Sequence, residues 1–243
     1  MQTNHRILNR EGERLDVSFH GGEHSGVMVV LGHGVTGNKD RPLIVAVAEG
    51  LAKKGWPCIR FSFSGNGGSQ GKFEDSCISK EVDDLLSILK TIPQEIRIAY
   101  IGHSMGAAVG VKTAATDMTI QALVSLAGMV NTAGFLEREF GDVEPGNGFM
   151  WDEPSCPLSQ RYADDMKEIG TVLPEIEHLI VPLLLIHGDE DDVVPIEDSR
   201  LAFKTAKSHK ELLEISGAGH SFGDESYPQI IDAIDVWLRR CFG

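Results

Sequence analysis

RIAYIGHSMGAAVGVKTAA, residues 97–115, joins an apolar run to a run of small residues through one serine. Residues 98–101 have the character of a buried strand, and the small residues that follow Gly106 are compatible with a helix. Between the two runs, the pentapeptide Gly-His-Ser-Met-Gly has Ser104 at its centre. A G-x-S-x-G pattern between a strand and a helix is typical of a tight turn, or nucleophile elbow, that exposes a serine hydroxyl. We therefore predict that Ser104 is a nucleophile and that the preceding His103 points away from the pocket.

Further apolar runs, rich in β-branched residues and bounded by glycine or polar turns, resemble central parallel strands. They cover residues 27–33, 58–63, 122–128 and 182–188. Helical patterns lie between or after them, with apolar stripes over residues 82–89 and 230–238. This alternation predicts an α/β fold with a mostly parallel central sheet and helices on both faces. The alternating residues 15–20 predict an antiparallel edge strand.

The strand-helix rhythm breaks after residue 128. Residues from about 131 to 178 contain glycines and prolines, with aromatic side chains spread among acidic ones. Because a structureless loop of this length is unusual, we predict a cap inserted into a single domain of residues 1–243, with one helix within 157–169. The cap is expected to cover the carboxyl end of the sheet. Its aromatic candidates for lining a substrate pocket are Phe135, Phe149, Trp151 and Tyr162.

A serine nucleophile needs a base and a carboxylate that orients the base. His220 lies in a glycine-flanked loop after a candidate strand at 211–216, and four consecutive acids at 189–192 follow the apolar run 182–188. The chain also contains a second pentapeptide of the same form, centred on Ser221, but no histidine follows His220 to serve it. We therefore predict that Ser104, one acid of residues 189–192 and His220 act together.

These motifs and their order resemble the α/β-hydrolases of the serine esterase and lipase type, from residue 33 to residue 222. Feruloyl or cinnamoyl esterases, monoacylglycerol lipase-like proteins and serine aminopeptidases of the S33 type are the nearest groups. In this family the acid takes the fifth position of H-G-x-x-D-x-x-V-P, so the resemblance implies that Asp191 is the acid of the triad. Asp189 is the nearest rival because it lies closer to the end of the strand.

The resemblance also implies an oxyanion hole made by the backbone N–H groups of Val35 and Met105. The chain departs from the family at Ser62 and Ser64, where many relatives have aspartate and arginine. We expect this departure to alter a loop-bracing ion pair and to leave the triad intact. Neither a cofactor nor a metal is expected for the acyl-transfer chemistry.

The predicted function is hydrolysis of small to medium carboxylic esters, with aryl and hydroxycinnamoyl esters among the candidates. The alternatives are a thioesterase, a lysophospholipase or monoacylglycerol lipase, and a ligand receptor that has this fold with little turnover. A formal net charge of −14 at pH 7 argues against nucleic acid as a partner. The N-terminus lacks an apolar signal region and the apolar runs are too short to span a bilayer. We expect a cytoplasmic monomer or homodimer without a membrane anchor that binds a small-molecule ester.

Overall fold

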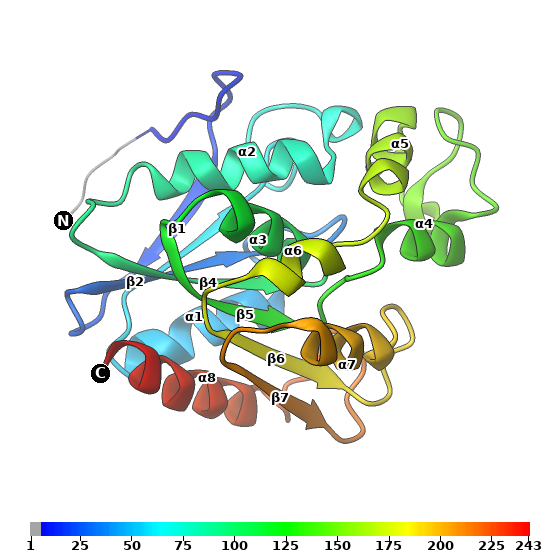
Figure 1. Ribbon diagram of the computed structural model, residues 1–243. Coiled ribbons are helices and arrows are strands. Elements are labelled where there is room, and N and C mark those ends of the chain that lie inside the picture. Colours follow the sequence, from blue (N-terminus) through cyan, green and yellow to red (C-terminus); the bar gives the residue numbers. More distant parts are fainter. Residues whose placement is uncertain (1–5) are drawn as a thin grey trace.

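The computed structural model describes residues 6–243 (Figure 1), so residues 1–5 of the predicted single domain lie outside the described part. Seven strands of this part form one sheet in the order β1-β3-β2-β4-β5-β6-β7. They are β1 (Asp16–His20), β2 (Val27–Gly32), β3 (Cys58–Ser62), β4 (Arg97–His103), β5 (Ile120–Leu126), β6 (Leu183–Gly188) and β7 (Lys210–Ile215). β1 pairs antiparallel with β3, and all other neighbouring strands are parallel. The predicted mostly parallel sheet with an antiparallel edge strand is confirmed.

Helices cover both faces of the sheet, as predicted. They are α1 (Pro42–Lys53), α2 (Ile78–Leu89), α3 (Met105–Thr116), α4 (Thr132–Phe140), α5 (Gln160–Ile169), α6 (Leu173–His178), α7 (Ile196–Thr205) and α8 (Tyr227–Phe242), with short 3₁₀ turns η1 (Phe73–Asp75) and η2 (Met150–Asp152). Figure 1 shows α1 and α8 on one face, and α2, α3 and α6 on the other.

The buried apolar side chains form two clusters, one on each face of the sheet, because successive side chains along a strand point to opposite faces. In β2, Val29 and Leu31 pack with apolar residues of α1 and α8, whereas Val30 between them packs with residues of α2 and α3. All three side chains are fully buried. A central strand buried on both faces therefore reads as a continuous apolar run, which is why the sequence pattern identified it.

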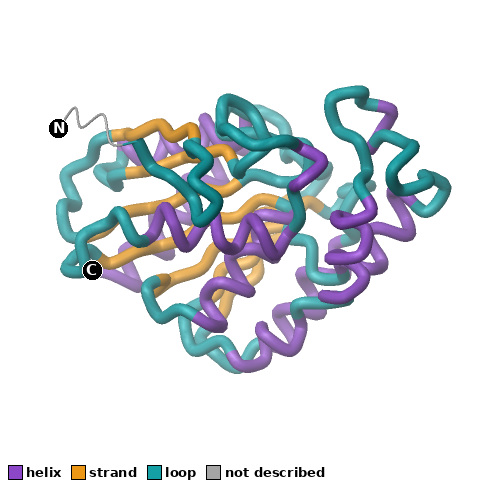
Figure 2. The backbone as a smooth tube through the Cα atoms, turned by 90° about the horizontal axis from the view of Figure 1, so that it is seen from above, coloured by secondary structure: helices purple, strands orange, loops and turns teal. Residues whose placement is uncertain are grey.

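Residues 132–178 lie between β5 and β6 and contain four of the helical segments, α4, η2, α5 and α6. Figures 1 and 2 show α4 and α5 beyond the carboxyl ends of the central strands. The start of α5 follows from its sequence, because the Ser159 hydroxyl accepts a hydrogen bond from the Tyr162 backbone N–H at 3.1 Å and caps the helix. This end of the sheet is where open α/β folds bind ligands.

Candidate active site

Ser104 lies in the turn between β4 and α3 with φ 54° and ψ −120°. A positive φ is strained for a residue other than glycine, so surrounding contacts must hold this turn. The Ser104 backbone N–H donates to the Leu126 carbonyl at 2.9 Å, and the Ser104 carbonyl accepts from the N–H groups of Ala107 and Met129 at 3.0 and 3.1 Å. β4 and β5 therefore position the serine jointly, although they are separated in sequence by α3.

The two glycines of the pentapeptide are required by close backbone approach. A Cβ atom at Gly102 would overlap the carbonyl of Gly106, and a Cβ atom at Gly106 would come within 2.5 Å of the His33 carbonyl oxygen. The turn therefore packs against both its own helix and the loop after β2. This close packing is the physical reason for the G-x-S-x-G spacing at this position.

Asp191 and His220 form a direct hydrogen bond. His220 Nδ1 donates to Asp191 Oδ2 at 2.8 Å, and the Asp191 carboxyl is fully buried. Its other oxygen, Oδ1, accepts from the backbone N–H groups of Val193 and Val194, both at 2.9 Å. Burial alone would raise the pKa of Asp191, but hydrogen bonds from His187 and His220 outweigh it and hold the pKa well below the usual range. The carboxylate is therefore ionised at neutral pH and can orient the His220 ring.

His187 supports the same carboxylate from β6. Its buried Nε2 lies 3.1 Å from Asp191 Oδ2 and 2.9 Å from the Val194 carbonyl oxygen. A carbonyl only accepts, so Nε2 carries the hydrogen, and the Ser199 hydroxyl donates to His187 Nδ1 at 2.7 Å. The contact of His187 with Asp191 becomes visible only in the fold.

Among the four acids that follow β6, Asp191 is the one that bonds His220. The side chains of Asp189, Glu190 and Asp192 are exposed. Asp189 Oδ1 accepts instead from the Gly217 backbone N–H at 2.6 Å and so braces the neighbouring loop. The geometry therefore brings His220 to Asp191 and gives Asp189 a different partner.

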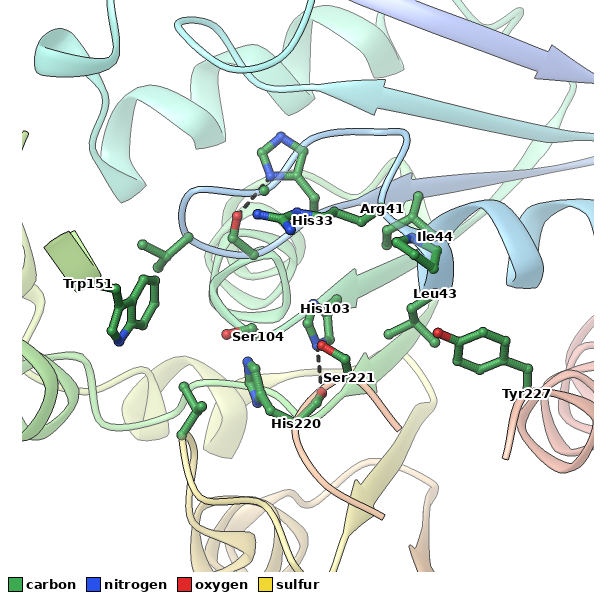
Figure 3. A pocket seen from close by; sticks show the side chains of 15 residues that line it. His33, Arg41, Leu43, Ile44, His103, Ser104, Trp151, His220, Ser221 and Tyr227 are labelled. Carbon is green, nitrogen blue, oxygen red and sulfur yellow. Dashed lines mark hydrogen bonds between the residues drawn. The ribbon is translucent and has the colours of Figure 1, made fainter. Parts of the chain in front are cut away.

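Ser104 and His220 line one cavity of about 450 Å³ (Figure 3). No hydrogen bond joins the Ser104 hydroxyl to the His220 ring in the described residues, a common situation in sites without substrate. The prediction that His103 points away from the pocket is wrong, because His103 also lines this cavity. Its Nε2 donates to the His220 carbonyl at 3.0 Å, since the loop that carries His220 closes over the end of β4. Burial lowers the pKa of His103 to about 3, so this ring is neutral.

The loop after β2 passes directly beside the serine. A Cβ atom at Gly34 would lie 2.8 Å from Ser104 Cβ, and the next residue, Val35, lines the cavity. His33 holds the loop in place: its Nδ1 donates to the Gly34 carbonyl at 2.8 Å, and its Nε2 accepts from the Phe63 N–H at 3.0 Å. Burial lowers the pKa of His33 to about 4, which keeps the ring neutral and suited to both bonds. This geometry brings Gly34, the residue before Val35, into close contact with Ser104.

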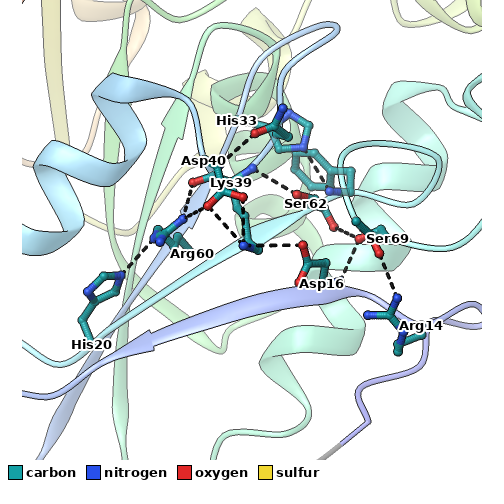
Figure 4. Close-up of polar contacts among 12 residues, drawn as sticks. Arg14, Asp16, His20, His33, Lys39, Asp40, Arg60, Ser62 and Ser69 are labelled. Atoms are coloured by element: carbon teal, nitrogen blue, oxygen red, sulfur yellow. Dashed lines mark hydrogen bonds and ion pairs between the residues drawn. The ribbon is translucent and has the colours of Figure 1, made fainter. Parts of the chain in front are cut away.

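A second set of contacts braces the far end of this loop (Figure 4). The Ser62 hydroxyl accepts from the Lys39 backbone N–H at 3.0 Å, and the Ser62 carbonyl accepts from the Ser69 hydroxyl at 2.7 Å. Arg60 forms an ion pair with Asp40. The hydroxyl of Ser62 thus holds this loop in place.

The remaining residues predicted for the site lie in different surroundings: some in the core, one in the wall of the cavity and one at the surface. Met105 begins α3, where the first backbone N–H groups have no partner within the helix. Its side chain is buried and its sulfur accepts a hydrogen bond from the hydroxyl of buried Tyr162. Of the four aromatic candidates, Trp151 lines the cavity; Phe135 and Tyr162 are 1% exposed in the core, and Phe149 is 42% exposed outside the cavity.

Trp151 reaches the cavity through an unusual backbone conformation, with φ 48° and ψ 37°. Its ring lies edge-on against Phe140, with a centroid distance of 4.8 Å, and its Nε1 donates to Glu139 Oε2 at 3.1 Å. The indole is therefore anchored on α4 and forms the wall of the cavity on the side of the inserted segment.

Several residues that line the cavity were not predicted from the sequence. They come from the start of α1, the loop after Asp191 and the start of α8: Arg41, Pro42, Leu43, Ile44, Val193 and Tyr227. α1 begins at Pro42, eight residues after the H-G pair, so its first turn lies at the same end of the sheet as the loop after β2. Residues 6–243 contain no group of three or more histidine, cysteine or acidic side chains placed to hold a metal ion. No described helix is long and apolar enough to cross a membrane.

Comparison with known proteins agrees with this architecture. The model of the α/β-hydrolase fold family matches residues 27–155, more than half of the chain, and that of the S33 serine aminopeptidases matches residues 157–226. Human palmitoyl-protein thioesterase ABHD10, mitochondrial, is 27% identical over 191 residues, which cover 72% of this chain and 59% of the human protein. The chain thus spans about three fifths of that relative.

Two solved structures have the same fold over nearly their whole length. Est1E from Butyrivibrio proteoclasticus, with ferulic acid bound, has a TM-score of 0.82 at 24% identity, covering 96% of this chain and 98% of its own. Alpha/beta hydrolase domain-containing protein 10 from mouse has a TM-score of 0.79 at 20% identity, covering 98% and 97%. With the family match to residues 27–155, the chain belongs to the α/β-hydrolase family.

Proposed function

We propose that this protein is a serine hydrolase that cleaves small to medium carboxylic esters. The observation that carries the proposal is the 2.8 Å bond between His220 Nδ1 and the buried Asp191 carboxylate, at the edge of a cavity that also contains Ser104. A base held by an ionised acid, beside a serine whose strained turn places it in a cavity, is the arrangement that nucleophilic acyl transfer requires.

In the proposed reaction, His220 Nε2 takes the proton of Ser104 Oγ as the oxygen attacks the ester carbonyl. The tetrahedral oxyanion accepts hydrogen bonds from the backbone N–H groups of Val35 and Met105, and loss of one such donor typically costs about 3 to 4 kcal/mol. His220 then returns the proton to the leaving alcohol, and an acyl group remains on Ser104. Water repeats the sequence and releases the acid, while Asp191 stabilises the charged imidazole in each step.

The size of the cavity supports ester substrates of modest length. A volume of about 450 Å³ lies in the lower part of the range for small-molecule sites. Aryl and hydroxycinnamoyl esters belong to the proposal, and the Est1E structure with bound ferulic acid makes them reasonable test substrates. A thioesterase is the second candidate, because the human relative is named a palmitoyl-protein thioesterase.

The remaining expectations from the sequence stay predictions. They are a monomer or homodimer, a cytoplasmic location, and no dependence on nucleic acid or on a membrane anchor. The mammalian ABHD10 relatives are named as mitochondrial, so microscopy of a tagged chain is the direct test of location.

Ser104→Ala and Ser221→Ala form a matched test of the proposal, since both serines line the cavity and both occupy the centre of a Gly-His-Ser-x-Gly sequence. Loss of the nucleophile should lower kcat on 4-nitrophenyl acetate by roughly a millionfold, as in other serine hydrolases. The Ser221 variant should keep kcat within about tenfold. Hydrolysis by the Ser104→Ala variant at the wild-type rate would refute the proposal. A panel of acetyl, octanoyl and feruloyl esters beside octanoyl thioesters then separates esterase from thioesterase.

A further inference from the structure

Arg41 is the cation among the cavity residues, and it plays no part in the acyl-transfer steps above. It precedes α1 as its N-cap residue, and its side chain makes no capping hydrogen bond. Figure 3 shows this side chain extending from the start of α1 toward the part of the cavity that contains Ser104. Its position is therefore that of a group that can contact a bound substrate.

One contact holds the guanidinium in place. Arg41 Nη2 donates to the Thr36 carbonyl at 3.1 Å. Thr36 itself has a φ of 54°, so a strained backbone presents this carbonyl to the arginine. The guanidinium is thus anchored on the loop that contains Val35. An arginine side chain carries five N–H donors, and this contact uses one of them.

The nearby acids are occupied elsewhere. Asp40, the neighbour of Arg41 in sequence, forms ion pairs with Lys39 and Arg60 (Figure 4). Among the described residues, Arg41 forms no salt bridge within 4.0 Å, and no aspartate or glutamate lines the cavity. The chain as a whole has a formal charge of −14, so an unpaired cation here gives the cavity a local charge opposite to that of the molecule.

The other titratable side chains of the cavity do not cancel this charge. Burial lowers the pKa of His33 to about 4 and that of His103 to about 3, so both rings are neutral at pH 7. Asp191 is ionised, but it lies behind His220 and is not among the lining residues. A substrate in the cavity therefore meets one permanently charged group, the guanidinium of Arg41.

We propose that Arg41 binds a carboxylate on the substrate, so that the protein prefers esters carrying a free carboxylate over neutral esters of the same size. The inference rests on the proposed esterase function and specifies its substrate class. A guanidinium and a carboxylate match in shape and can form two parallel N–H···O bonds. Because Arg41 lies on the Ser104 side of the cavity, the bound carboxylate would belong to the same small molecule as the scissile ester.

Two pairs of esters test the proposal. The first pair is 4-acetoxybenzoate and its neutral methyl ester, which place the charge on the alcohol side. The second is mono-4-nitrophenyl glutarate and 4-nitrophenyl pentanoate, which place it on the acyl side. In at least one pair, we expect wild-type kcat/KM to be about tenfold higher for the anionic member, chiefly through KM, and this preference should decrease with added salt.

Variants assign that preference to the arginine. Arg41→Met should lower the anionic-to-neutral ratio of kcat/KM about tenfold, and Arg41→Lys should retain part of it. Arg10→Met is the matched control, since it removes the same charge from an 81% exposed side chain outside the cavity, and it should leave the ratio as in the wild type. An unchanged ratio in Arg41→Met, or an equal change in Arg10→Met, would overturn the proposal.

A binding measurement separates this inference from the proposed function. Calorimetry on the Ser104→Ala protein compares 3-phenylpropionate with the neutral 3-phenylpropionamide. We expect tighter binding of the carboxylate, and loss of the difference when Arg41→Met is added. If the wild type cleaves no ester of the panel, the esterase proposal fails and calorimetry still decides the role of Arg41. If esters are cleaved but adding Arg41→Met changes the binding of neither ligand, only the inference about Arg41 fails.

Discussion

Replacing Asp191 with asparagine should inactivate the protein, because the change would shift His220, the proposed base, to the wrong tautomer. The Asp191 carboxylate accepts hydrogen bonds at both oxygens: Oδ1 from the backbone N–H groups of Val193 and Val194, and Oδ2 from His220 Nδ1 and His187 Nε2. All four distances lie between 2.8 and 3.1 Å. An asparagine has a single acceptor oxygen, so only one of the two pairs of donors can be satisfied.

The two placements of the new amide differ in cost. With its NH₂ toward Val193 and Val194, it would confront two backbone donors, and each donor costs about 1 to 3 kcal/mol when it is left unpaired away from water. With its NH₂ toward His220, His187 can still donate to the Val194 carbonyl, 2.9 Å from its Nε2. The second placement is therefore favoured. It forces His220 Nδ1 to accept, which moves the hydrogen to Nε2 and prevents that atom from taking the proton of Ser104.

A wrong tautomer of this kind lowers kcat by about 10⁴, or about 5.5 kcal/mol of barrier. Steady-state hydrolysis of 4-nitrophenyl acetate measures kcat and KM, and thermal melting verifies that the variant is folded. Asp189→Asn is the matched control; its exposed carboxyl accepts from the Gly217 N–H, so kcat should stay within a few-fold of wild type. The reasoning is refuted if Asp191→Asn retains more than a tenth of the wild-type kcat, or if the control loses as much.

Two further predictions concern other buried groups. His103→Ala removes the 3.0 Å hydrogen bond to the His220 carbonyl, worth about 1 kcal/mol, so kcat should decrease about fivefold with little change in KM; an unchanged kcat would exclude this positioning role. Glu81→Gln should raise stability at neutral pH, because burial raises the pKa of this 2% exposed carboxyl well above its ordinary value of 4.5. Above pH 4.5 the unfolded chain ionises more readily than the folded one, which lowers the stability of the wild type by up to about 1.4 kcal/mol per pH unit. Urea denaturation at pH 5 and 7.5 should show that the stability advantage of the Glu81→Gln variant grows with pH, whereas a constant difference would contradict the prediction.

The local signals in the sequence were sufficient for the architecture. Central strands are buried on both faces, so their apolar runs are continuous and easy to identify, and the helices between them show a regular apolar stripe. The elbow at Ser104 was also predictable, because its tight turn tolerates only glycine at the two flanking positions. In both cases the pattern of neighbouring residues along the chain carries the signal, although the loop after β2 and the end of β5 also hold the turn at Ser104.

The composition of the site depended on segments that meet only in the folded chain. The order of motifs selected Ser104 and His220, and family resemblance pointed to Asp191 within a run of four acids. The structure gives a physical basis for that choice, since Asp191 is the acid that turns inward to His220.

Other features of the cavity had no local signature at all. Arg41 and Trp151 come from segments more than 100 residues apart, and both line the same cavity as Ser104. The direction of a side chain at the end of a strand also depends on what packs against it. The loop that carries His220 encloses the ring of His103, the last residue of β4, which we expected to point elsewhere. The sequence by itself determined the sheet, its helices and the position of the tight turn at Ser104, because these follow from local periodicity and backbone sterics. Tertiary packing alone decided which side chains share the cavity, because side-chain direction in loops is set by contacts between distant segments.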